Sequence, residues 1–382
     1  MAYHKKNTAT MKLDFALFNY FPYGGLQRDC IKTAIECQKL NHSINIYTTE
    51  WDGERPSGFN IHLLPVTGVS NHCRMKSFQK KLLKATKQES GDFLIGFNKL
   101  DGLDVYFASD PCYREKAIKE RSFFYRLSHR YKTYEQLERA VFEPDSNTVI
   151  LTLTEQQKQD FQKNYQTQDD RFKLLPPGIE KNLFFQDKSH IRAEYRKQFN
   201  ISENSNLLLM VGSSFKTKGL DRAITALAFL SKLKLKDTRL LVVGGDNPET
   251  FIRMAKKLKA MNNIIFCGAR SDATKLMLCA DALIHPAYTE SAGMVLVEAI
   301  AAGLPVLTTS NCGYAYHIEA ANAGIVSPTP FNQNLFNHSL LEILNTERLK
   351  QFHENAINYA SNTDLYSLHQ QAAKIINTLL EK

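Results

Sequence analysis

With 382 residues the chain is longer than an ordinary single domain, so two domains are the natural expectation. An apolar content of 43% can supply two cores, and 12 prolines and 18 glycines are too few for long disordered stretches. The formal net charge of +9 favours anionic partners, namely phosphates, acidic lipids or nucleic acid, unless it only keeps the surface soluble.

The seven cysteines are scattered along the chain and none belongs to a C-x-x-C pair. Neither a disulfide framework nor a zinc site is therefore predicted, which fits a reducing cytoplasm. No secretory signal opens the chain, and no run of 18 apolar residues is present to span a membrane. We expect a cytoplasmic protein without a transmembrane helix.

In the first half, short apolar runs alternate with amphipathic runs, the βα pattern of a parallel sheet. The first expected helix has Leu26, Cys30, Thr33, Cys37 and Leu40 on one face, close to a 3.6-residue period. Thr154 followed by Gln157 predicts a capping box at the start of another helix. The expected strands cover residues 12–18, 44–48, 60–65, 93–97, 105–108 and 149–153.

The pattern restarts after Pro176-Pro177-Gly178, because paired prolines and a glycine end regular structure. Here the expected strands cover residues 207–211, 240–244, 264–267, 283–285, 306–308 and 325–327. A last helix, roughly residues 364–380, could return to the first domain.

The predicted fold class is therefore α/β, with two Rossmann-like parallel-sheet domains facing each other across a cleft. Ligands of such sheets bind at the carboxyl ends of the strands, so the cleft is the expected site. The expected boundaries are a loose tail over residues 1–10, domains over 11–180 and 181–362, and a crossing-back helix over 363–382.

The most informative segment is residues 287–310, AYTESAGMVLVEAIAAGLPVLTTS. A strand ends, a turn of small polar residues carries Glu290, and a helix follows that carries Glu298. The amides from Ala292 through Gly293 and Met294 to Val295 would face a ligand and, with the helix dipole, bind an anion or hydroxyls. Two carboxylates suit bidentate bonding to vicinal sugar hydroxyls. The alternative is a capped helix with two solvated glutamates.

Two further turns join a strand to a helix through glycine. In NYFPYGGLQRD (residues 19–29) the glycines bring backbone close to a phosphate or sugar, although such a pair is often only a tight turn. In VGSSFKTKGLDR (residues 211–222), Lys216 and Lys218 are positioned to meet a diphosphate, or are simply solvated. Neither the dinucleotide fingerprint nor a Walker P-loop is matched.

Together these motifs resemble retaining GT-B glycosyltransferases of the family 4 type, and within them the lipopolysaccharide core glucosyltransferase I group. GFNKLDGLDVYFASDPCY (residues 96–113), YRLSHRY (125–131), LLPPGI (174–179) and TDLYSL (363–368) look like the same group, and the resemblance covers residues 11–382. It implies transfer of glucose from UDP-glucose to a heptosylated lipopolysaccharide core, with retention at the anomeric carbon. UDP-galactose or UDP-N-acetylglucosamine as donor, and another lipid-linked or glucan acceptor, remain alternatives.

The resemblance also implies site roles. Glu298 would hold the ribose, Glu290 and the amides after it the sugar and diphosphate, and Lys218 the leaving diphosphate. Gly25, Asp29 and Tyr113 would line the donor and acceptor side, and Arg270 would meet the uracil. Similar proteins carry arginine where this chain has Thr217 and Leu183, and Lys216 is a candidate substitute for the first.

Two expectations rest on the residues themselves. Asp110, just after the strand at 105–108, is our candidate for the group nearest the reacting centre; the alternative is that it caps the helix after Pro111. No D-x-D stretch is present, so no obligatory metal or other cofactor is expected.

The basic and aromatic segment from Lys116 to Lys132 holds six Lys or Arg residues and one Glu, with aromatic residues between them. Cations near anionic headgroups contribute about 1 kcal/mol each, and aromatic rings favour the lipid interface. We expect peripheral attachment to the cytoplasmic face of the inner membrane, although a core helix with a basic outer face is the alternative. The expected membrane contacts are Lys116, Lys119, Arg121, Phe123, Phe124, Arg126, Arg130 and Lys132.

Three rival classes fit less well. A nucleic-acid-binding protein shares the charge but needs a recognition fold or aromatic platform that the sequence does not show, so nucleic acid is not expected as a partner. A nicotinamide oxidoreductase lacks its glycine fingerprint here. A glycogen-synthase-like polymerase is a nearer rival, and acceptor profiling separates it from a transferase that needs a heptosylated core.

Overall fold

The structure is a computed structural model that describes residues 10–22, 24–89, 93–181, 188–233 and 237–381. The chain divides into two compact units, the first formed by residues 1–176 with 367–382 and the second by residues 177–366. Of the expected tail over residues 1–10, all but residue 10 lie outside the described residues, as does Leu183.

The first unit is built on a seven-stranded parallel sheet with the order β3-β2-β1-β4-β5-β6-β7. The chain runs outward from β1 to β3 and then returns to β4, so the strand order reverses between β1 and β4. In such sheets ligands bind outside the carboxyl ends of the strands at that reversal. The strands are β1 (Lys12–Ala16), β2 (Ser43–Thr48), β3 (Phe59–Leu63), β4 (Phe93–Gly96), β5 (Val105–Ala108), β6 (Val149–Thr152) and β7 (Phe172–Leu174).

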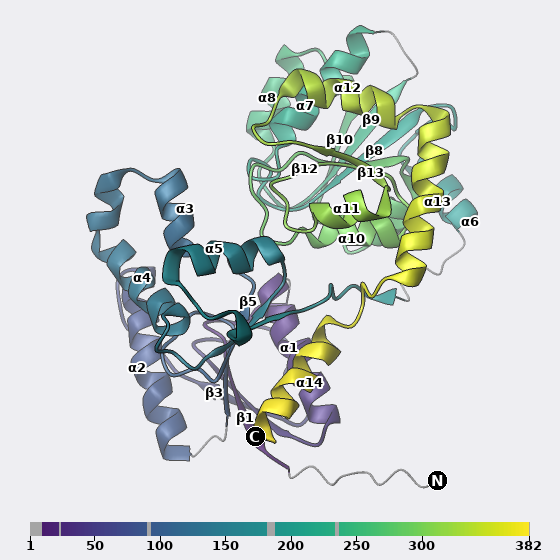
Figure 1. Cartoon of the computed structure of the whole chain (residues 1–382). Coiled ribbons are helices and arrows are strands. Elements are labelled where there is room, and N and C mark those ends of the chain that lie inside the picture. Colours follow the sequence, from purple (N-terminus) through teal and green to yellow (C-terminus); the bar gives the residue numbers. More distant parts are fainter. Residues whose placement is uncertain (1–9, 23, 90–92, 182–187, 234–236, 382) are drawn as a thin grey trace, which may run out of the picture. The chain divides into compact units, whose positions relative to one another are not determined.

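Helices cover both faces of this sheet, with α2 and α4 on one side and α1 and α14 on the other (Figure 1). Phe78, Leu82, Val141, Phe142 and Phe161 fill the core beneath α2, α4 and α5. The helices are α1 (Gly25–Lys39), α2 (Asn71–Glu89), α3 (Tyr113–Glu120), α4 (His129–Phe142), α5 (Glu155–Tyr165) and α14 (Leu368–Leu380), with short 3-10 turns η1 (Phe123–Leu127) and η2 (Asp169–Arg171).

The second unit has a six-stranded parallel sheet with the order β10-β9-β8-β11-β12-β13, which reverses between β8 and β11. The strands are β8 (Asn206–Val211), β9 (Thr238–Val243), β10 (Ile264–Gly268), β11 (Ala282–His285), β12 (Val306–Thr309) and β13 (Gly324–Ser327).

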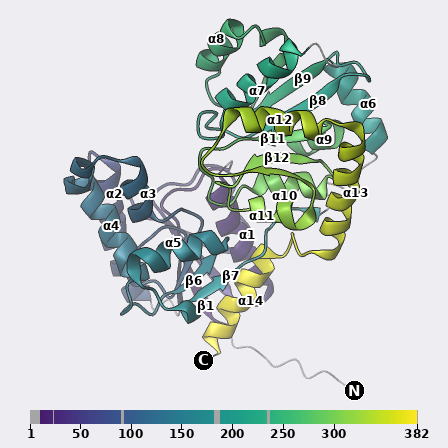
Figure 2. The ribbon, with the colours of Figure 1, turned by 45° about the horizontal axis from the view of Figure 1, so that its top comes forward.

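In the second unit α7, α8 and α12 cover one face of the sheet and α10 and α11 the other (Figures 1 and 2). On α7 the buried Leu220, Ala223, Ile224, Leu227 and Leu230 recur at helical spacing, which turns one apolar stripe onto the sheet. The helices are α6 (Lys188–Gln198), α7 (Leu220–Lys232), α8 (Glu249–Lys257), α9 (Ala273–Cys279), α10 (Met294–Ala301), α11 (Ala315–Ala321), α12 (Gln333–Ile343), α13 (Thr346–Asn362) and the 3-10 turn η4 (Met261–Asn263).

All twelve strands expected from the sequence are present in these positions, and the parallel α/β prediction is confirmed. Strand β7 was missed, because it is only three residues long and Lys173 and Leu174 are exposed at the sheet edge. The last helix starts at Leu368 rather than near residue 364, and it packs against α1. None of the described helices combines the length and apolarity needed to cross a bilayer.

The expected capping box on α5 is half correct. Thr154 Oγ1 accepts a hydrogen bond from the amide of Gln157 at 3.2 Å, as predicted. Gln157 Oε1, however, accepts from the amide of Leu153 rather than from that of Thr154.

Candidate active site

Glu290 lies in the turn after β11, at the point where the second sheet reverses its order. Its amide donates to Asn311 O and its carbonyl accepts from the Gly313 amide, both at 3.0 Å, so two backbone bonds hold this residue against the turn after β12. The carboxylate accepts a hydrogen bond from Lys218 Nζ, and only 17% of the side chain is exposed. The structure therefore fixes both the backbone and the side chain of Glu290.

The helix that follows Glu290 begins without a side-chain cap. Its N-cap, Gly293, has φ of 89°, in the left-handed region that favours glycine, and as a glycine it has no side chain to accept a bond from the first turn of α10. Free amides at a helix start, together with the helix dipole, attract an anion. Ala292 and Gly293 are buried, whereas Met294, Val295 and Glu298 are partly exposed.

Lys218 comes from the turn between β8 and α7, on the neighbouring strand of the sheet. The next residue, Gly219, has φ of 78°, and a Cβ there would lie only 2.0 Å from the carbonyl oxygen of Pro286. This close approach presses the turn after β8 against the turn after β11 and brings Lys218 to Glu290. Burial lowers the pKa of the Lys218 amino group.

Lys216 is held elsewhere. Its amino group donates to Asp221 Oδ2 at 2.7 Å and to the Tyr288 hydroxyl at 3.2 Å, and it lies over the Tyr288 ring. Thr217 lies between the two lysines and is exposed, with its carbonyl accepting a bond from the Tyr288 amide. Lys216 is therefore tied to α7 and not to Glu290.

The sequence did not reveal His285, the last residue of β11. Its side chain is fully buried, Nε2 lies 3.5 Å from Glu290 Oε2, and neither ring nitrogen makes a hydrogen bond to any described residue. Burial, reinforced by the charge of Lys218, lowers its pKa to about 3. The imidazole is therefore neutral at pH 7 and lies next to the Glu290 carboxylate. In the sequence, a single polar residue at the end of an apolar strand was the feature that could have indicated this site residue.

The Arg270 side chain, expected to meet the uracil, is paired with a carboxylate. Its guanidinium forms a two-bond pair with the carboxylate of Asp272, at 2.7 and 2.5 Å, and Asp272 also accepts a bond from the Tyr195 hydroxyl. This pairing lowers the pKa of Asp272 to about 2. An Arg-x-Asp pair two residues apart could have been read from the sequence.

In the first unit, the two glycines of residues 19–29 lead directly into α1. Gly25 is the first residue of that helix, and a Cβ there would meet no described neighbour within 4 Å. Asp29 lies one turn further on, where its carboxylate lies 3.1 Å from His369 Nε2 on α14. This residue therefore joins α1 to α14, a contact between residues 340 positions apart that the sequence could not show.

Asp110 and Tyr113 both line a cavity of about 350 Å³ beyond the carboxyl end of β5. The Asp110 side chain is exposed and does not cap α3, whose N-cap is Cys112 without a side-chain bond, so that alternative is wrong. Gln157 Nε2 donates to the carbonyl oxygens of Ala108 at 2.7 Å and of Asp110 at 2.8 Å. The backbone that carries Asp110 is therefore fixed from α5.

Glu138 on α4 supplies the missing cap, and no local sequence pattern pointed to it. Its fully buried carboxylate accepts bonds from the amides of Tyr113 at 2.7 Å and Arg114 at 2.9 Å. It also accepts from Lys99 Nζ at 2.5 Å and from the Tyr165 hydroxyl at 2.7 Å. Burial opposes ionisation, but Lys99 and the two amides outweigh it and lower the pKa of Glu138.

The basic and aromatic segment spans α3, η1 and the start of α4. Phe123 and Phe124 are 63% and 79% exposed, and Ile118 and Leu127, which were not among the expected membrane contacts, are also exposed. Lys119 pairs with Glu115 at 3.2 Å, and Arg126 lies over the Phe123 ring. The exposed charged members are Lys116, Lys119, Arg121, Arg130 and Lys132, with Arg126 partly exposed.

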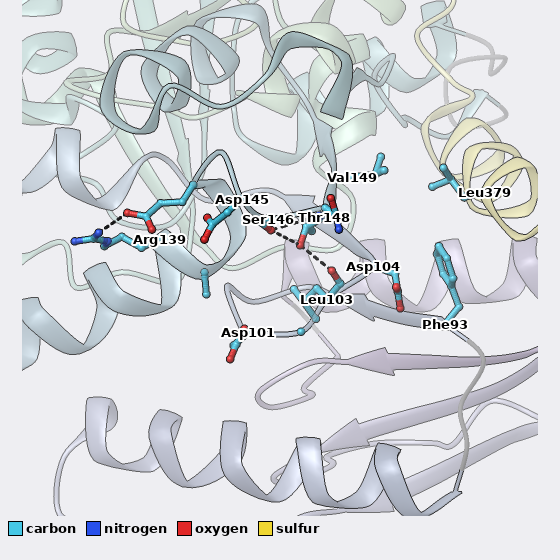
Figure 3. Close-up of a pocket in the computed structure, with 14 residues that line it drawn as sticks. Phe93, Asp101, Leu103, Asp104, Arg139, Asp145, Ser146, Thr148, Val149 and Leu379 are labelled. Carbon is cyan, nitrogen blue, oxygen red and sulfur yellow. Dashed lines mark hydrogen bonds and ion pairs between the residues drawn. The ribbon is translucent and has the colours of Figure 1, made fainter. Parts of the chain in front are cut away.

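A wider cavity of about 570 Å³ lies at the amino ends of β4, β5 and β6, away from these residues (Figure 3). Asp101, Asp104 and Asp145 line it, and its Arg139 is paired with Glu143 at 2.5 Å. An acidic cavity at the amino edge of a parallel sheet is a poor site for an anionic ligand. No cluster of three candidate metal ligands occurs within the described residues.

Comparison with known proteins places this geometry in a family. Over 368 residues the chain is 45% identical to the lipopolysaccharide glucosyltransferase WaaG of Escherichia coli (strain K12), covering 96% of this chain and 98% of that protein. Residues 191–363 match the family described as "Glycosyl transferases group 1". The chain belongs to this glycosyltransferase family. It is an enzyme that passes a sugar from a donor to an acceptor.

Solved structures agree on the fold. A crystal structure of WaaG, a glycosyltransferase involved in lipopolysaccharide biosynthesis, matches 95% of this chain and 99% of its own with a TM-score of 0.88. Anabaena Alr3699/HepE, solved in complex with UDP and glucose, matches 96% of this chain and 100% of its own with a TM-score of 0.72 at 17% identity, a likeness of fold alone. The expected GT-B fold class of this glycosyltransferase, with two Rossmann-like parallel-sheet domains, is confirmed.

The buried His285 gives a prediction about stability and pH. Its pKa of about 3 in the folded chain lies below the ordinary 6.5, so the unfolded chain binds more protons between these values. The contribution of the neutral His285 to the free energy of unfolding is therefore fully present above pH 6.5. It decreases as the pH falls, and about 2 kcal/mol of it is lost at pH 5. We expect His285→Gln to lose less stability between pH 7 and pH 5 than the wild type, as measured by hydrogen exchange of the β11 amides.

The pKa of His317 is lowered by burial to about 4, so His317 still makes the stability of His285→Gln depend on pH. The exposed His338 gives the control, His338→Gln, which should retain the wild-type slope. An identical slope for His285→Gln and the wild type would show that His285 does not stay neutral.

Proposed function

We propose that this glycosyltransferase is a retaining enzyme that transfers glucose from UDP-glucose to a heptose of the lipopolysaccharide inner core. The observation that supports this most is that Lys218, Glu290 and the uncapped start of α10 meet at one strand reversal. They do so in a chain that is 45% identical, over almost its whole length, to a lipopolysaccharide glucosyltransferase. A transferase using UDP-galactose or UDP-N-acetylglucosamine, or another lipid-linked or glucan acceptor, is the alternative.

The donor would bind through the second unit. The amides from Ala292 to Val295 and the amino group of Lys218 would hold the diphosphate, because both offer positive charge in a partly buried setting. Glu290 would accept bonds from the sugar hydroxyls and Glu298 from the ribose. Since Asp272 holds the Arg270 side chain, we propose that uracil meets the backbone there rather than the guanidinium.

Chemistry then depends on the leaving group. Negative charge grows on the nucleoside diphosphate as the anomeric bond breaks, and a fixed cation and aligned amides stabilise that charge selectively in the transition state. The acceptor hydroxyl would attack the face from which the diphosphate leaves. Asp110 remains our proposal for the group of the first unit that acts at the reacting centre, and no metal is required in this scheme.

The donor assignment predicts an order of reactivity among nucleotide sugars. With a heptose-terminated core acceptor, we expect the purified chain to release UDP fastest from UDP-glucose, at a kcat/KM at least about tenfold above that for UDP-galactose or UDP-N-acetylglucosamine. EDTA should leave the rate unchanged. A faster reaction with another donor, or elongation of a soluble glucan, would select the alternative.

The role of Glu290 predicts a loss of turnover. Glu290→Ala removes a contact to the reacting sugar and leaves Lys218 without its carboxylate, so kcat should fall by roughly 10²–10³. Steady-state transfer from UDP-glucose measures this. Glu319→Ala, which removes an exposed glutamate of α11, is the charge-matched control. Unchanged turnover in purified, folded Glu290→Ala would remove this residue from the mechanism.

We also propose that the first unit attaches to the cytoplasmic face of the inner membrane through the basic and aromatic segment. Phe123 and Phe124 would enter the lipid interface, while Lys119, Arg126 and Lys132 would meet anionic headgroups. This is supported by their exposure and by the cations that surround them.

Vesicle flotation tests the attachment. The double variant Phe123→Ser, Phe124→Ser should bind vesicles containing anionic lipid at least about tenfold more weakly than the wild type, because two exposed rings no longer enter the interface. Leu335→Ser, at an exposed apolar position of the second unit, should bind as the wild type does. Equal wild-type binding to neutral and anionic vesicles, or no binding, would contradict the proposal.

A further inference from the structure

The cavity next to Asp110 and Tyr113 belongs wholly to the first unit. Its volume is about 350 Å³, enough for a sugar residue, and it opens beyond the carboxyl ends of β4 and β5. The loops after these two strands form one wall, and α3, η1 and α4 form the other. It therefore lies at the functional edge of the sheet.

The cavity carries a surplus of positive charge. Lys99 lines it but is neutralised by the buried Glu138 at 2.5 Å. Lys116, Arg121 and Arg130 also line it, and none of the three forms an ion pair with a carboxylate of the described residues. Asp110 is the one carboxylate among the described residues that line the cavity. Three cations against one carboxylate in a concave site create a field that attracts an anion.

Two of these cations lie over aromatic rings. The Arg121 guanidinium lies 5.6 Å from the Tyr125 ring centre, and that of Arg130 lies 5.7 Å from the Tyr134 ring centre. The hydroxyls of Tyr113 and Tyr125 are bonded to each other at 2.7 Å. Flat rings with fixed guanidinium groups beside them fit a ligand with an apolar ring face and a charged oxygen group.

We propose that this cavity binds an anionic group, a carboxylate or a phosphate, carried by a sugar of the acceptor. The proposal rests on the proposed function and specifies how the acceptor is recognised: by charge in the first unit, in addition to the hydroxyl that reacts. The cations that line the cavity, Lys116, Arg121 and Arg130, would thus bind glycan rather than lipid headgroups.

A geometric division within the basic and aromatic segment supports this choice over a membrane headgroup. Phe123 and Phe124, the most exposed aromatic residues of the segment, do not line the cavity. Neither do Lys119, Arg126 and Lys132. A bilayer contacts protruding side chains, whereas a cavity lined by tyrosines selects a ligand that enters it.

The test uses the triple variant Lys116→Gln, Arg121→Gln, Arg130→Gln, called the cavity variant, with a delipidated core oligosaccharide that keeps its carboxylates and phosphates. Without vesicles present, the KM for this acceptor should rise about tenfold or more, because charge-assisted hydrogen bonds are lost. The KM for UDP-glucose should not change. With the same oligosaccharide after carboxyl reduction and dephosphorylation, wild type and cavity variant should show the same raised KM.

Two charge-matched variants separate the alternatives. Lys80→Gln, Lys84→Gln, Lys173→Gln removes three exposed lysines elsewhere on the first unit and should keep the wild-type acceptor KM. A second triple, in which Lys119, Arg126 and Lys132 become Gln, should weaken vesicle flotation without raising the KM for the soluble acceptor.

Several outcomes would overturn the proposal. If the cavity variant loses vesicle flotation but keeps its acceptor KM, these cations serve lipid headgroups. Equal wild-type KM values for the charged and the neutralised oligosaccharide would equally refute it. Calorimetry distinguishes this failure from that of the proposed function. If the wild type binds the charged oligosaccharide, the cavity variant does not, and no transfer occurs, the result supports the cavity and contradicts the proposed reaction. Neither binding nor transfer would overturn both.

Discussion

The contact between Lys218 and Glu290 is the interaction on which the candidate site depends. The two side chains come from turns after adjacent strands, and about four fifths of each is removed from solvent. Each charge alone would be costly at this depth, so each needs the other until a ligand arrives. A diphosphate would compete with Glu290 for Lys218, and this exchange would free the carboxylate for the sugar hydroxyls.

Glycine makes that contact possible. Gly219 allows the turn after β8 to touch the carbonyl oxygen of Pro286, and Gly293 takes the left-handed conformation that starts α10 without a capping side chain. Beneath them the neutral His285 fills the space without adding a charge that would compete with Lys218 for Glu290. An anion bound here would therefore meet one cation and the amides at the start of α10, in a place that the backbone already fixes.

In the first unit a buried carboxylate both caps a helix and pairs with a largely buried lysine. The start of α3 has no cap of its own, and Glu138 reaches across from α4 to accept from its first two amides. The same carboxylate neutralises Lys99, which allows both charges to be buried. Because this network orders the ends of β4 and β5, the cavity beside Asp110 and Tyr113 has a fixed wall rather than a loose loop.

Much of this could be predicted from the sequence, for identifiable reasons. Strands buried on both faces appear as apolar runs, so the two sheets were visible, whereas the exposed edge strand β7 was not. Glycine next to charged residues marked the turns that carry Lys218 and Glu290. Contacts between distant parts of the chain left no local pattern: Asp29 with His369, and Lys99 with Glu138, whose position on an amphipathic helix resembles an ordinary surface site.

The basic and aromatic segment shows why local structure decides what a charge does. In one continuous helix the 3.6-residue period would align Lys116, Lys119, Phe123, Arg126 and Arg130 in a single stripe suited to a membrane. The chain instead ends α3 at Glu120, turns through η1, and begins α4 at His129. This break turns Lys116 and Arg130 toward the tyrosines of the cavity and leaves Phe123 exposed outside it. A short 3-10 turn thus divides one run of positive charge into cations that line the cavity and cations that lie outside it.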